Sequence, residues 1–260
     1  MSNNNIFESN RIAWNQAMEY HQQARKDSLE VGFENSAFTV FNGEYDHILI
    51  AKLNHVDLTG KTIAQLPCNN GQELLSLMRL GAKEAVGFDI SDVAISEAKL
   101  LADIANLNVN YVRTDILEIN DKYNGRFDFI YISEGSLQWF PSLCDYFSVV
   151  SRLLKKNGQL LIYEMHPFMF FFDNGFKKLS SYFEKGPYNY VNGLDYLGGV
   201  EYESNECFWF MHKMSDIISA LLVDFEILEF EEYNFGHTDS KLVKPLGRVP
   251  FCFILSGRKK

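Results

Sequence analysis

Three acidic residues of this chain follow apolar runs that resemble buried strands. They are Asp89, Asp115 and Glu134, and each stands within a few residues of the end of its run. If these runs are parallel strands, their carboxyl ends meet at one edge of a sheet, where open α/β sheets bind their ligands. A carboxylate there accepts hydrogen bonds from hydroxyl or amino groups. The pattern therefore predicts a polar ligand site on that edge.

The position of Asp89 favours a ribose-binding acid. A doubly wound nucleotide-binding fold places such an acid at the end of the second strand, and its two oxygens can accept both ribose hydroxyls. Capping of the next helix is the other interpretation, although Ser91 and Asp92 already compete for that role. Asp115 could accept the amino group of adenine with Ile116 beside the ring, or it could be a plain loop acid.

The segment 61–89 reads as strand, tight turn, helix and strand, which is one βαβ unit. A dinucleotide site would need Gly-x-Gly-x-x-Gly in the turn, so that bare backbone can contact a pyrophosphate. Only Gly71 is present, because Pro67 and Asn69 fill places where glycine would be wanted. Proline has no N–H for a phosphate, and asparagine adds bulk while tolerating left-handed backbone. A nucleoside without phosphates fits this turn better, and S-adenosylmethionine is a common one.

Candidate proton acceptors are less well defined. His166 and His212 have the side chain whose pKa lies nearest neutrality, and Glu134 could face a substrate. Each histidine could equally be a buried hydrogen-bonding residue, and Glu134 could only cap a helix. The six histidines show no metal-ligand spacing, so no metal site is expected. A Gly-x-Ser-x-Gly elbow and a P-loop are both missing, which disfavours serine hydrolase and NTPase chemistry.

Composition indicates an ordinary globular protein of 260 residues with one large core. The formal net charge is −10 and the pI about 5.1, which argues against a broad nucleic-acid-binding face. The four cysteines are scattered, as in reduced cytoplasmic proteins. The polar start lacks an apolar segment, and the densest apolar patch, 168–172, is too short to span a bilayer. We therefore expect no signal peptide and no membrane partner.

Periodicity predicts an α/β chain with a doubly wound, mostly parallel sheet. Strands are expected at 62–66, 85–88, 109–113, 127–132, 159–165, 225–233 and 249–256, and helices at 11–25, 44–53, 72–80, 93–105, 143–154 and 214–222. The basic residues 258–260 are taken as a solvated tail. Residues 1–58 form either a helical cover or a lid over a cofactor, to which Trp14, Tyr20 or Phe38 could contribute. The aromatic-rich stretch 167–210 is an insertion and is expected to form a substrate cap.

With these residues in place, the chain resembles the class I S-adenosylmethionine-dependent methyltransferases over about 61–165 and again through its last helix and strands. WNQAMEYH, CNNGQELLSLMRLGA, SEGSLQWFP, YEMHPF and FWFMHKMSDIISAL are together similar to a poorly characterised bacterial branch of that family. The resemblance implies a single domain with a seven-stranded sheet whose final strand is antiparallel. The family usually has an acid where Gln65 stands and glycines where Pro67 and Asn69 stand.

The resemblance implies that S-adenosyl-L-methionine is the cofactor and that the residues of the strand ends hold it. Gln65 would hydrogen-bond the ammonium of the methionine moiety, Asp89 the ribose and Asp115 the adenine. The full expected cofactor set is Gln65, Pro67, Cys68, Asn69, Gly71, Asp89, Ile90, Asp115, Ile116, Ser133 and Glu134.

The leading hypothesis is methyl transfer to an unidentified small molecule by a cytoplasmic monomer or homodimer, with His166 or His212 as base. The compact aromatic cap and the acidic charge favour a small acceptor over tRNA or DNA. The altered turn leaves open a non-catalytic protein that binds S-adenosylmethionine or another nucleoside. An NAD-dependent oxidoreductase is disfavoured by the missing glycines.

Overall fold

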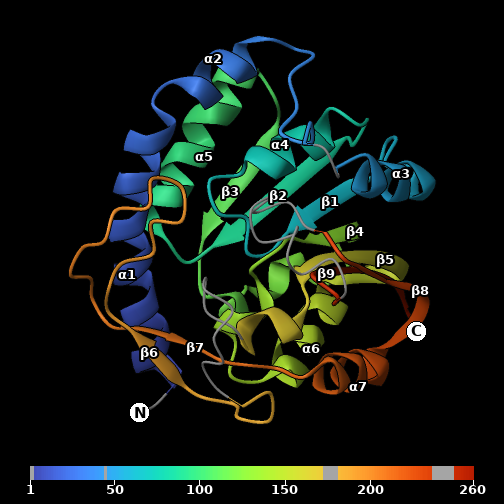
Figure 1. The fold of residues 1–260 in the computed structure, drawn as a ribbon. Coiled ribbons are helices and arrows are strands. Elements are labelled where there is room, and N and C mark those ends of the chain that lie inside the picture. Colours follow the sequence, from blue (N-terminus) through green and yellow to red (C-terminus); the bar gives the residue numbers. More distant parts are fainter. Residues whose placement is uncertain (1–2, 44–45, 172–180, 236–248) are drawn as a thin grey trace.

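A computed structural model describes residues 3–43, 46–171, 181–235 and 249–260. Its centre is a seven-stranded sheet of order β3-β2-β1-β4-β5-β9-β8 (Figure 1). The strands are β1 (Thr62–Gln65), β2 (Glu84–Asp89), β3 (Val109–Arg113), β4 (Phe127–Ile132), β5 (Leu154–Met165), β8 (Phe225–Tyr233) and β9 (Cys252–Lys259). β1 to β5 pair in parallel, and β9 is antiparallel to both neighbours. The predicted doubly wound, mostly parallel sheet with an antiparallel final strand is confirmed.

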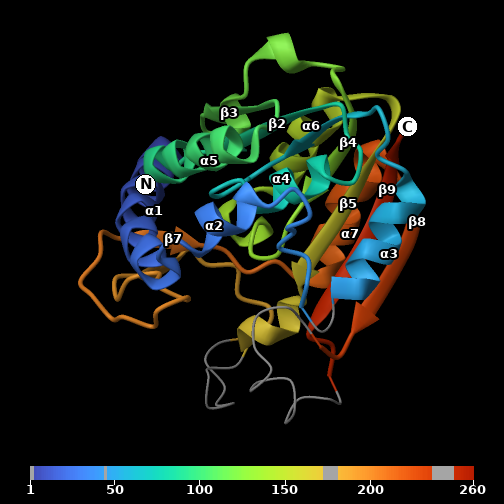
Figure 2. The same ribbon diagram turned by 90° about the horizontal axis from the view of Figure 1, so that it is seen from above.

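Helices cover both faces of the sheet, as the near-continuous apolar strands require (Figures 1 and 2). One core cluster packs α6 (Leu143–Leu153) and α7 (Met214–Asp224) against one face. The other packs α2 (Ser28–Glu34), α3 (Asp46–Val56), α4 (Gln72–Met78) and α5 (Asp92–Ala105) against the opposite face. Among the described residues, none of the helices combines the length and apolarity needed to cross a membrane.

Short 3₁₀ turns and a small hairpin complete the described fold. The turns are η1 (Ile116–Glu118), η2 (Asp121–Tyr123), η3 (Leu137–Trp139) and η4 (Pro167–Phe171). The hairpin joins β6 (Tyr188–Tyr190) to β7 (Cys207–Trp209) within the aromatic-rich insertion. Three further segments lie outside the described residues. They are 172–180 of that insertion, 44–45 at the start of a predicted helix, and 236–248 between β8 and β9.

Several predicted boundaries were wrong, each for a physical reason. Helix α1 (Asn3–Arg25) begins eight residues earlier than predicted, because Ile6 and Phe7 are buried near its start and the side chains of Ser9 and Asn10 bond to the insertion. β5 starts directly after α6 and five residues earlier than predicted, because Leu154 already pairs with Phe127 of β4. β9 begins and ends three residues later than predicted, because its pairing with β5 extends to Arg258, which also pairs with Glu226 of β8 instead of lying in a solvated tail.

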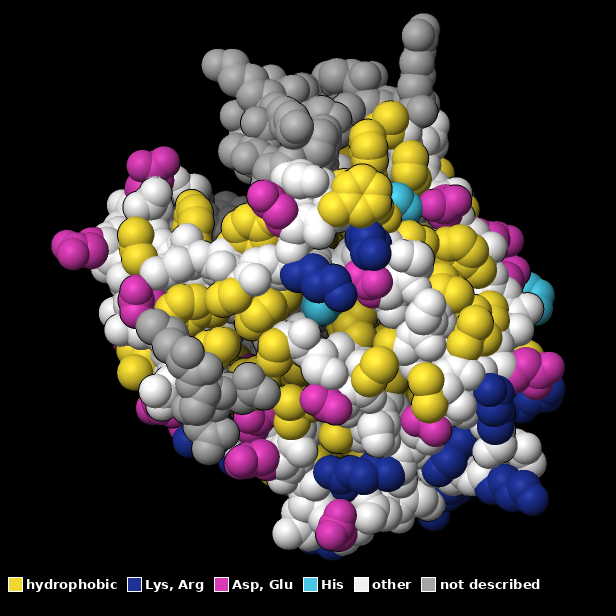
Figure 3. Space-filling view, turned by 90° about the horizontal axis from the view of Figure 1, so that it is seen from below, with side chains coloured by type: hydrophobic (Ala, Val, Ile, Leu, Met, Phe, Trp, Pro, Cys, Tyr) yellow, Lys and Arg dark blue, Asp and Glu magenta, His cyan; other side chains and the backbone are white. Residues whose placement is uncertain are grey.

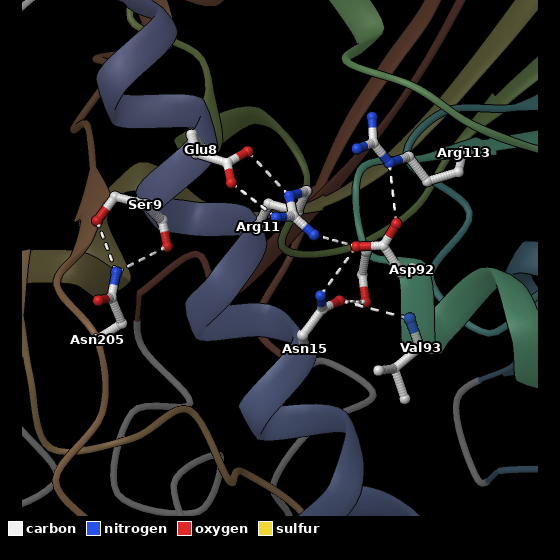
Figure 4. A network of polar contacts seen from close by, with 9 residues as sticks. Glu8, Ser9, Arg11, Asn15, Asp92, Val93, Arg113 and Asn205 are labelled. Carbon is white, nitrogen blue, oxygen red and sulfur yellow. Dashed lines mark hydrogen bonds and ion pairs between the residues drawn. The ribbon is translucent and has the colours of Figure 1, made fainter.

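The long helix α1 lies between the sheet and the insertion (Figure 1). On one side Asn10 makes two buried hydrogen bonds with the backbone of Phe208, 2.8 Å and 2.7 Å long. On the other side Asp92 accepts hydrogen bonds from Asn15, Arg11 and Arg113 at the start of α5 (Figure 4). These bonds tie α1 to both neighbours at once.

The Asp92 contacts predict a pH-dependent contribution to stability. The hydrogen bond from Asn15, with those from Arg113 and Arg11, lowers the pKa of Asp92 to about 2. A lowered folded-state pKa stabilises the fold above the unfolded value near 4, and this contribution is lost as the pH falls towards 2. Since the side chain is 47% exposed, we expect Asp92→Asn to cost only about 0.5–1 kcal/mol at pH 7.

Urea unfolding at pH 7 and near pH 2 measures this difference. The gap between wild type and Asp92→Asn should close at the lower pH, whereas Asp103→Asn, an exposed acid on the same helix, should leave stability unchanged. A gap of equal size at both pH values would contradict the assignment.

Candidate functional site

A cavity of about 1130 Å³ opens at the carboxyl edge of the parallel strands. That volume exceeds the roughly 300–1,000 Å³ of a typical small-ligand pocket, so it can hold two molecules side by side. Its walls come from α1, the ends of β1 to β5 and the insertion. The predicted cofactor residues that line it are Pro67, Cys68, Asn69, Asp89, Ile90, Asp115, Ile116, Ser133 and Glu134. The structure therefore brings most of the predicted cofactor residues together, while Gln65 and Gly71 lie behind the described lining.

The turn after β1 is shaped by two residues with left-handed backbone. Asn69 has a φ of +48° and Gly71 a φ of +74°. A side chain on Gly71 would collide with the ring of Tyr111 on β3, and the Tyr111 hydroxyl donates a 3.1 Å hydrogen bond to the Gly71 carbonyl. Gly71 is thus required by backbone conformation and packing.

Asp89 is held by the backbone on both sides of it. One carboxylate oxygen accepts from the N–H of Asn69 at 2.8 Å and the other from the N–H of Ser91 at 2.9 Å. Burial raises the pKa of Asp89, and these N–H groups lower it. A carboxylate has about four acceptor positions, so each oxygen keeps capacity for a further donor. Ser91 caps α5 through a 3.1 Å bond to the N–H of Ala94, which removes helix capping as the role of Asp89.

Asp115 also lines the cavity, and it caps η1. Its Oδ1 accepts from the N–H of Leu117 at 2.9 Å. Burial raises the pKa of Asp115, while that N–H lowers it. Ile116 is buried beside it in the lining. The capping bond uses one oxygen, which leaves acceptor capacity on the other for a ligand group.

Glu73 carries the charge that the sequence lacks at Gln65. Gln65 is fully buried, and its Nε2 donates to Glu73 at 2.7 Å and to Ser133 at 3.1 Å. Glu73, in the first turn of α4, lines the cavity and also accepts from the Tyr131 hydroxyl at 3.4 Å. The prediction focused on the glycine positions of the turn and missed Glu73. An acid two residues beyond Gly71 was the signal that could have revealed it.

A second group missed in the sequence joins α1 to this turn. Arg25 donates to both oxygens of Glu97 at 2.9 Å and 3.0 Å, and Asn70 donates to Glu97 at 2.9 Å. Arg25 and Asn70 line the cavity. Arg25 Nε and Asn70 Oδ1 are buried without a hydrogen-bond partner among the described residues. Buried polar atoms are normally satisfied, so a bound ligand can supply their partners.

Glu164 fixes the loop that carries Ser133 and Glu134. Its buried carboxylate accepts four backbone N–H groups, from Gly135, Ser136, Leu137 and Met165, at 2.5–3.0 Å. Burial raises the pKa of Glu164 to about 7, and the four N–H groups oppose that shift. Because the loop is anchored on the strand next to it, Glu134 is presented to the cavity from a defined backbone.

Neither predicted histidine base lies in the described lining. His166 accepts from the N–H of Phe168 at 3.1 Å through Nδ1 and meets Glu232 at 2.9 Å through Nε2. His212 Nε2 lies 2.9 Å from the Phe140 carbonyl. Burial lowers the pKa of both rings. These contacts are structural, so we do not carry either histidine forward as a base. Among the described residues, no three His, Cys, Asp or Glu side chains are grouped to hold a metal ion.

The strand order, with an antiparallel strand inserted beside β5 and a ligand edge at β1 to β4, defines the class I methyltransferase fold. Residues 63–158 match a family model described as a methyltransferase domain. Over this segment the chain is therefore similar to methyltransferase domains.

Similar proteins act on different substrates. The ubiquinone biosynthesis O-methyltransferase of Nitrosococcus oceani is 31% identical over 41% of this chain and 44% of its own length. A tRNA U34 carboxymethyltransferase of Campylobacter fetus subsp. fetus is 22% identical over 73% of this chain and 64% of its own. The chain thus matches less than half of the length of the O-methyltransferase and less than two thirds of the length of the carboxymethyltransferase.

A solved structure supports the fold. The S-adenosylmethionine-dependent methyltransferase from Mesorhizobium loti superimposes with a TM-score of 0.59 at 20% identity, covering 80% of this chain and 96% of that one. Because a tRNA-modifying enzyme is among the relatives, similarity by itself does not exclude a nucleic-acid acceptor.

The Glu164 contacts predict a large loss of stability on a nearly isosteric change. In Glu164→Gln one oxygen becomes an NH₂ group that faces two backbone N–H donors. Leaving buried donors unsatisfied costs about 1–3 kcal/mol each, so we expect the two donors to give a loss of about 2–6 kcal/mol in the free energy of unfolding. Urea unfolding at pH 8, above the pKa of Glu164, measures it.

The matched control is Glu226→Gln, which changes an exposed carboxylate paired with Arg258. It should cost about 1 kcal/mol or less. Equal losses in the two variants would show that Glu164 does not anchor the loop.

Proposed function

We propose that this protein is an S-adenosylmethionine-dependent methyltransferase that acts on a small molecule in the cytoplasm. The observation that carries the proposal is Asp89, which is buried at the carboxyl end of β2, fixed by two backbone N–H groups, and part of the cavity wall. Asp89 would hold the ribose hydroxyls, and Asp115 and Ile116 would hold the adenine. The turn 67–71 would pack against the nucleoside.

The amino-acid end of the cofactor would meet Glu73 and Arg25 rather than Gln65. Glu73 offers a negative charge to an ammonium group, and Arg25 offers a cation with a spare N–H to a carboxylate. Both lie near the Tyr196 hydroxyl: burial raises the pKa of Tyr196, nearby Arg25 lowers it, and Glu73 raises it. Both charges are therefore within electrostatic reach of Tyr196, which lines the same cavity.

When bound, S-adenosylmethionine supplies a methyl group on a sulfonium centre for attack by a nucleophile. The chain contributes by holding donor and acceptor in line and by excluding water, which can account for much of the rate enhancement. The insertion and α1 form the roof, because Trp14 of α1 and Trp209 of the insertion both line the cavity. We propose residues 1–58 as the lid and 167–210 as the substrate cap.

A small acceptor is favoured over a nucleic acid by charge. Arg25 is the one lysine or arginine in the described lining, and it is paired with Glu97. Nucleic-acid affinity depends on several cations that neutralise phosphates. The function is tested by calorimetric titration with S-adenosylmethionine and S-adenosylhomocysteine. Binding is expected, and absence of heat with both ligands at several temperatures would overturn the proposal.

The ribose assignment predicts a specific loss of affinity. Asp89→Asn removes the charge and one of the two acceptor oxygens. Hydrogen bonds to a charged group contribute about 1.5–3 kcal/mol each, so S-adenosylhomocysteine should bind about 10- to 100-fold more weakly. Asp92→Asn is the control, because Asp92 lies three residues away and outside the described lining. Unchanged affinity in Asp89→Asn would refute the ribose contact.

The Glu73 assignment predicts a loss confined to ligands with an amino-acid group. Glu73→Gln should weaken S-adenosylhomocysteine by about tenfold, about 1.4 kcal/mol. It should leave 5′-methylthioadenosine, which lacks the ammonium and carboxylate, unaffected. Calorimetry with both ligands gives the comparison. Equal weakening of the two would indicate a structural role for Glu73, and no weakening of either would remove it from the site.

Ligand binding without methyl transfer is the second candidate function, favoured by the fact that both predicted histidine bases lie outside the described lining. The two functions separate when the protein is incubated with methyl-labelled S-adenosylmethionine and a panel of small acceptors. Transfer of label to any acceptor supports the enzyme. Tight binding with no transfer across the panel supports the binding protein.

A further inference from the structure

A buried amide oxygen in the cavity wall has no hydrogen-bond donor among the described residues. It is Oε1 of Gln138, a residue that lines the cavity. Gln138 stands in η3 after β4, whereas Asp89 and Asp115 follow β2 and β3, on the other side of the central strand β1. Because a buried acceptor without a donor costs free energy, a donor group on a ligand can stabilise this atom. Gln138 therefore marks a polar contact point away from the proposed nucleoside end.

The backbone that carries Gln138 is held from two sides. The N–H of Leu137 donates to the Glu164 carboxylate on β5 at 3.0 Å. The carbonyl of Gln138 itself accepts from the N–H of Phe210, which follows β7 in the insertion, at 2.8 Å. The amide side chain is thus presented from a fixed position where η3, the sheet and the insertion meet.

Aromatic rings flank Gln138 in the lining. Trp139 packs edge-on against Trp14 of α1, with ring centroids 5.3 Å apart. Phe140 lies 6.4 Å from Phe7 of α1, also measured between ring centroids. All four rings line the cavity, and they join η3 to the first half of α1. Walls of this kind suit a ligand with a flat aromatic body.

The neighbouring polar groups of this wall already have partners. Asn10 uses both ends of its amide on the backbone of Phe208, at 2.8 Å and 2.7 Å. The indole N–H of Trp139 donates to the Gly135 carbonyl at 2.7 Å. Neither the four rings nor the Asn10 amide carries a charge. A neutral donor therefore suits Gln138 Oε1 and its surroundings.

The aromatic wall continues into the hairpin β6–β7. Trp209 lines the cavity and stacks on Tyr188 with ring centroids 4.5 Å apart. Tyr190 also lines the cavity and is 41% exposed. Figure 3 shows hydrophobic side chains reaching the surface on the underside of the molecule. The hairpin thus offers an apolar ligand a wall that runs from the cavity towards solvent.

We propose that Gln138 orients the methyl acceptor by accepting a hydrogen bond from its hydroxyl or ring N–H group, while an aromatic body lies against Trp14 and Trp139. This inference rests on the proposed methyltransferase function. The acceptor class is a neutral aromatic compound with one such donor, as in a phenol or an indole. A ligand of the same shape without the donor would leave Gln138 Oε1 buried and unsatisfied.

The test uses the full chain saturated with S-adenosylhomocysteine and two probes of one shape, indole and benzofuran, which differ in the N–H donor. In calorimetric titrations indole should bind about 3- to 10-fold more tightly than benzofuran. Gln138→Met keeps the length of the side chain and removes the amide, so it should lower the affinity for indole to that for benzofuran. Gln159→Met makes the same change at the start of the β4-paired part of β5, outside the described lining, and should alter neither affinity.

Equal binding of the two probes to the wild type, or no binding of either, would overturn the inference whether or not Gln138→Met folds. A preference for indole that survives in folded Gln138→Met would overturn the role of Gln138. The affinity for S-adenosylhomocysteine is measured separately on each protein. Failure of the probes alone leaves the methyltransferase proposal standing, whereas failure of S-adenosylhomocysteine to bind overturns that proposal first.

Discussion

The site depends on one constraint, namely that two backbone N–H groups from separate segments converge on the Asp89 carboxylate. Asn69 belongs to the turn after β1 and Ser91 to the start of α5, and both donate to Asp89 at under 3 Å. This carboxylate therefore joins the turn to the helix and sets the floor of the cavity. The same group is the proposed ribose anchor, so fold and ligand binding draw on a single buried acid.

Around this floor, charged groups that are far apart in the sequence form the walls. Arg25 of α1 reaches Glu97 of α5, and Asn70 of the turn donates to the same carboxylate. The C-terminal end of α1 is thus held beside the turn 67–71. Asn10, nearer the start of α1, holds the helix to the insertion. α1 contacts both the sheet side of the site, through α5, and the insertion. Closure of the site would therefore require α1 and the insertion to move together, or to separate at these polar contacts.

The sequence was sufficient for the sheet and for the acids at the strand ends, since apolar runs and turn residues are local signals. It failed where tertiary contacts decide. The start of α1 depends on the packing of Ile6 and on the bonds of Ser9 and Asn10, all made to the insertion, and these tertiary contacts cannot be read from local periodicity. The exchange of roles between Gln65 and Glu73 depends on a 2.7 Å contact across eight residues. His166 and His212 have suitable chemistry, but only packing reveals that other groups bond to both ring nitrogens of His166 and to Nε2 of His212.

A crystal structure of the full chain with S-adenosylhomocysteine tests the central claim most directly. The account predicts the ribose hydroxyls within hydrogen-bonding distance of Asp89, the ammonium group beside Glu73, and open space beside Gln138 and Trp139. A dinucleotide carried through purification in that crevice, or a ligand that leaves Asp89 without a new contact, would contradict it.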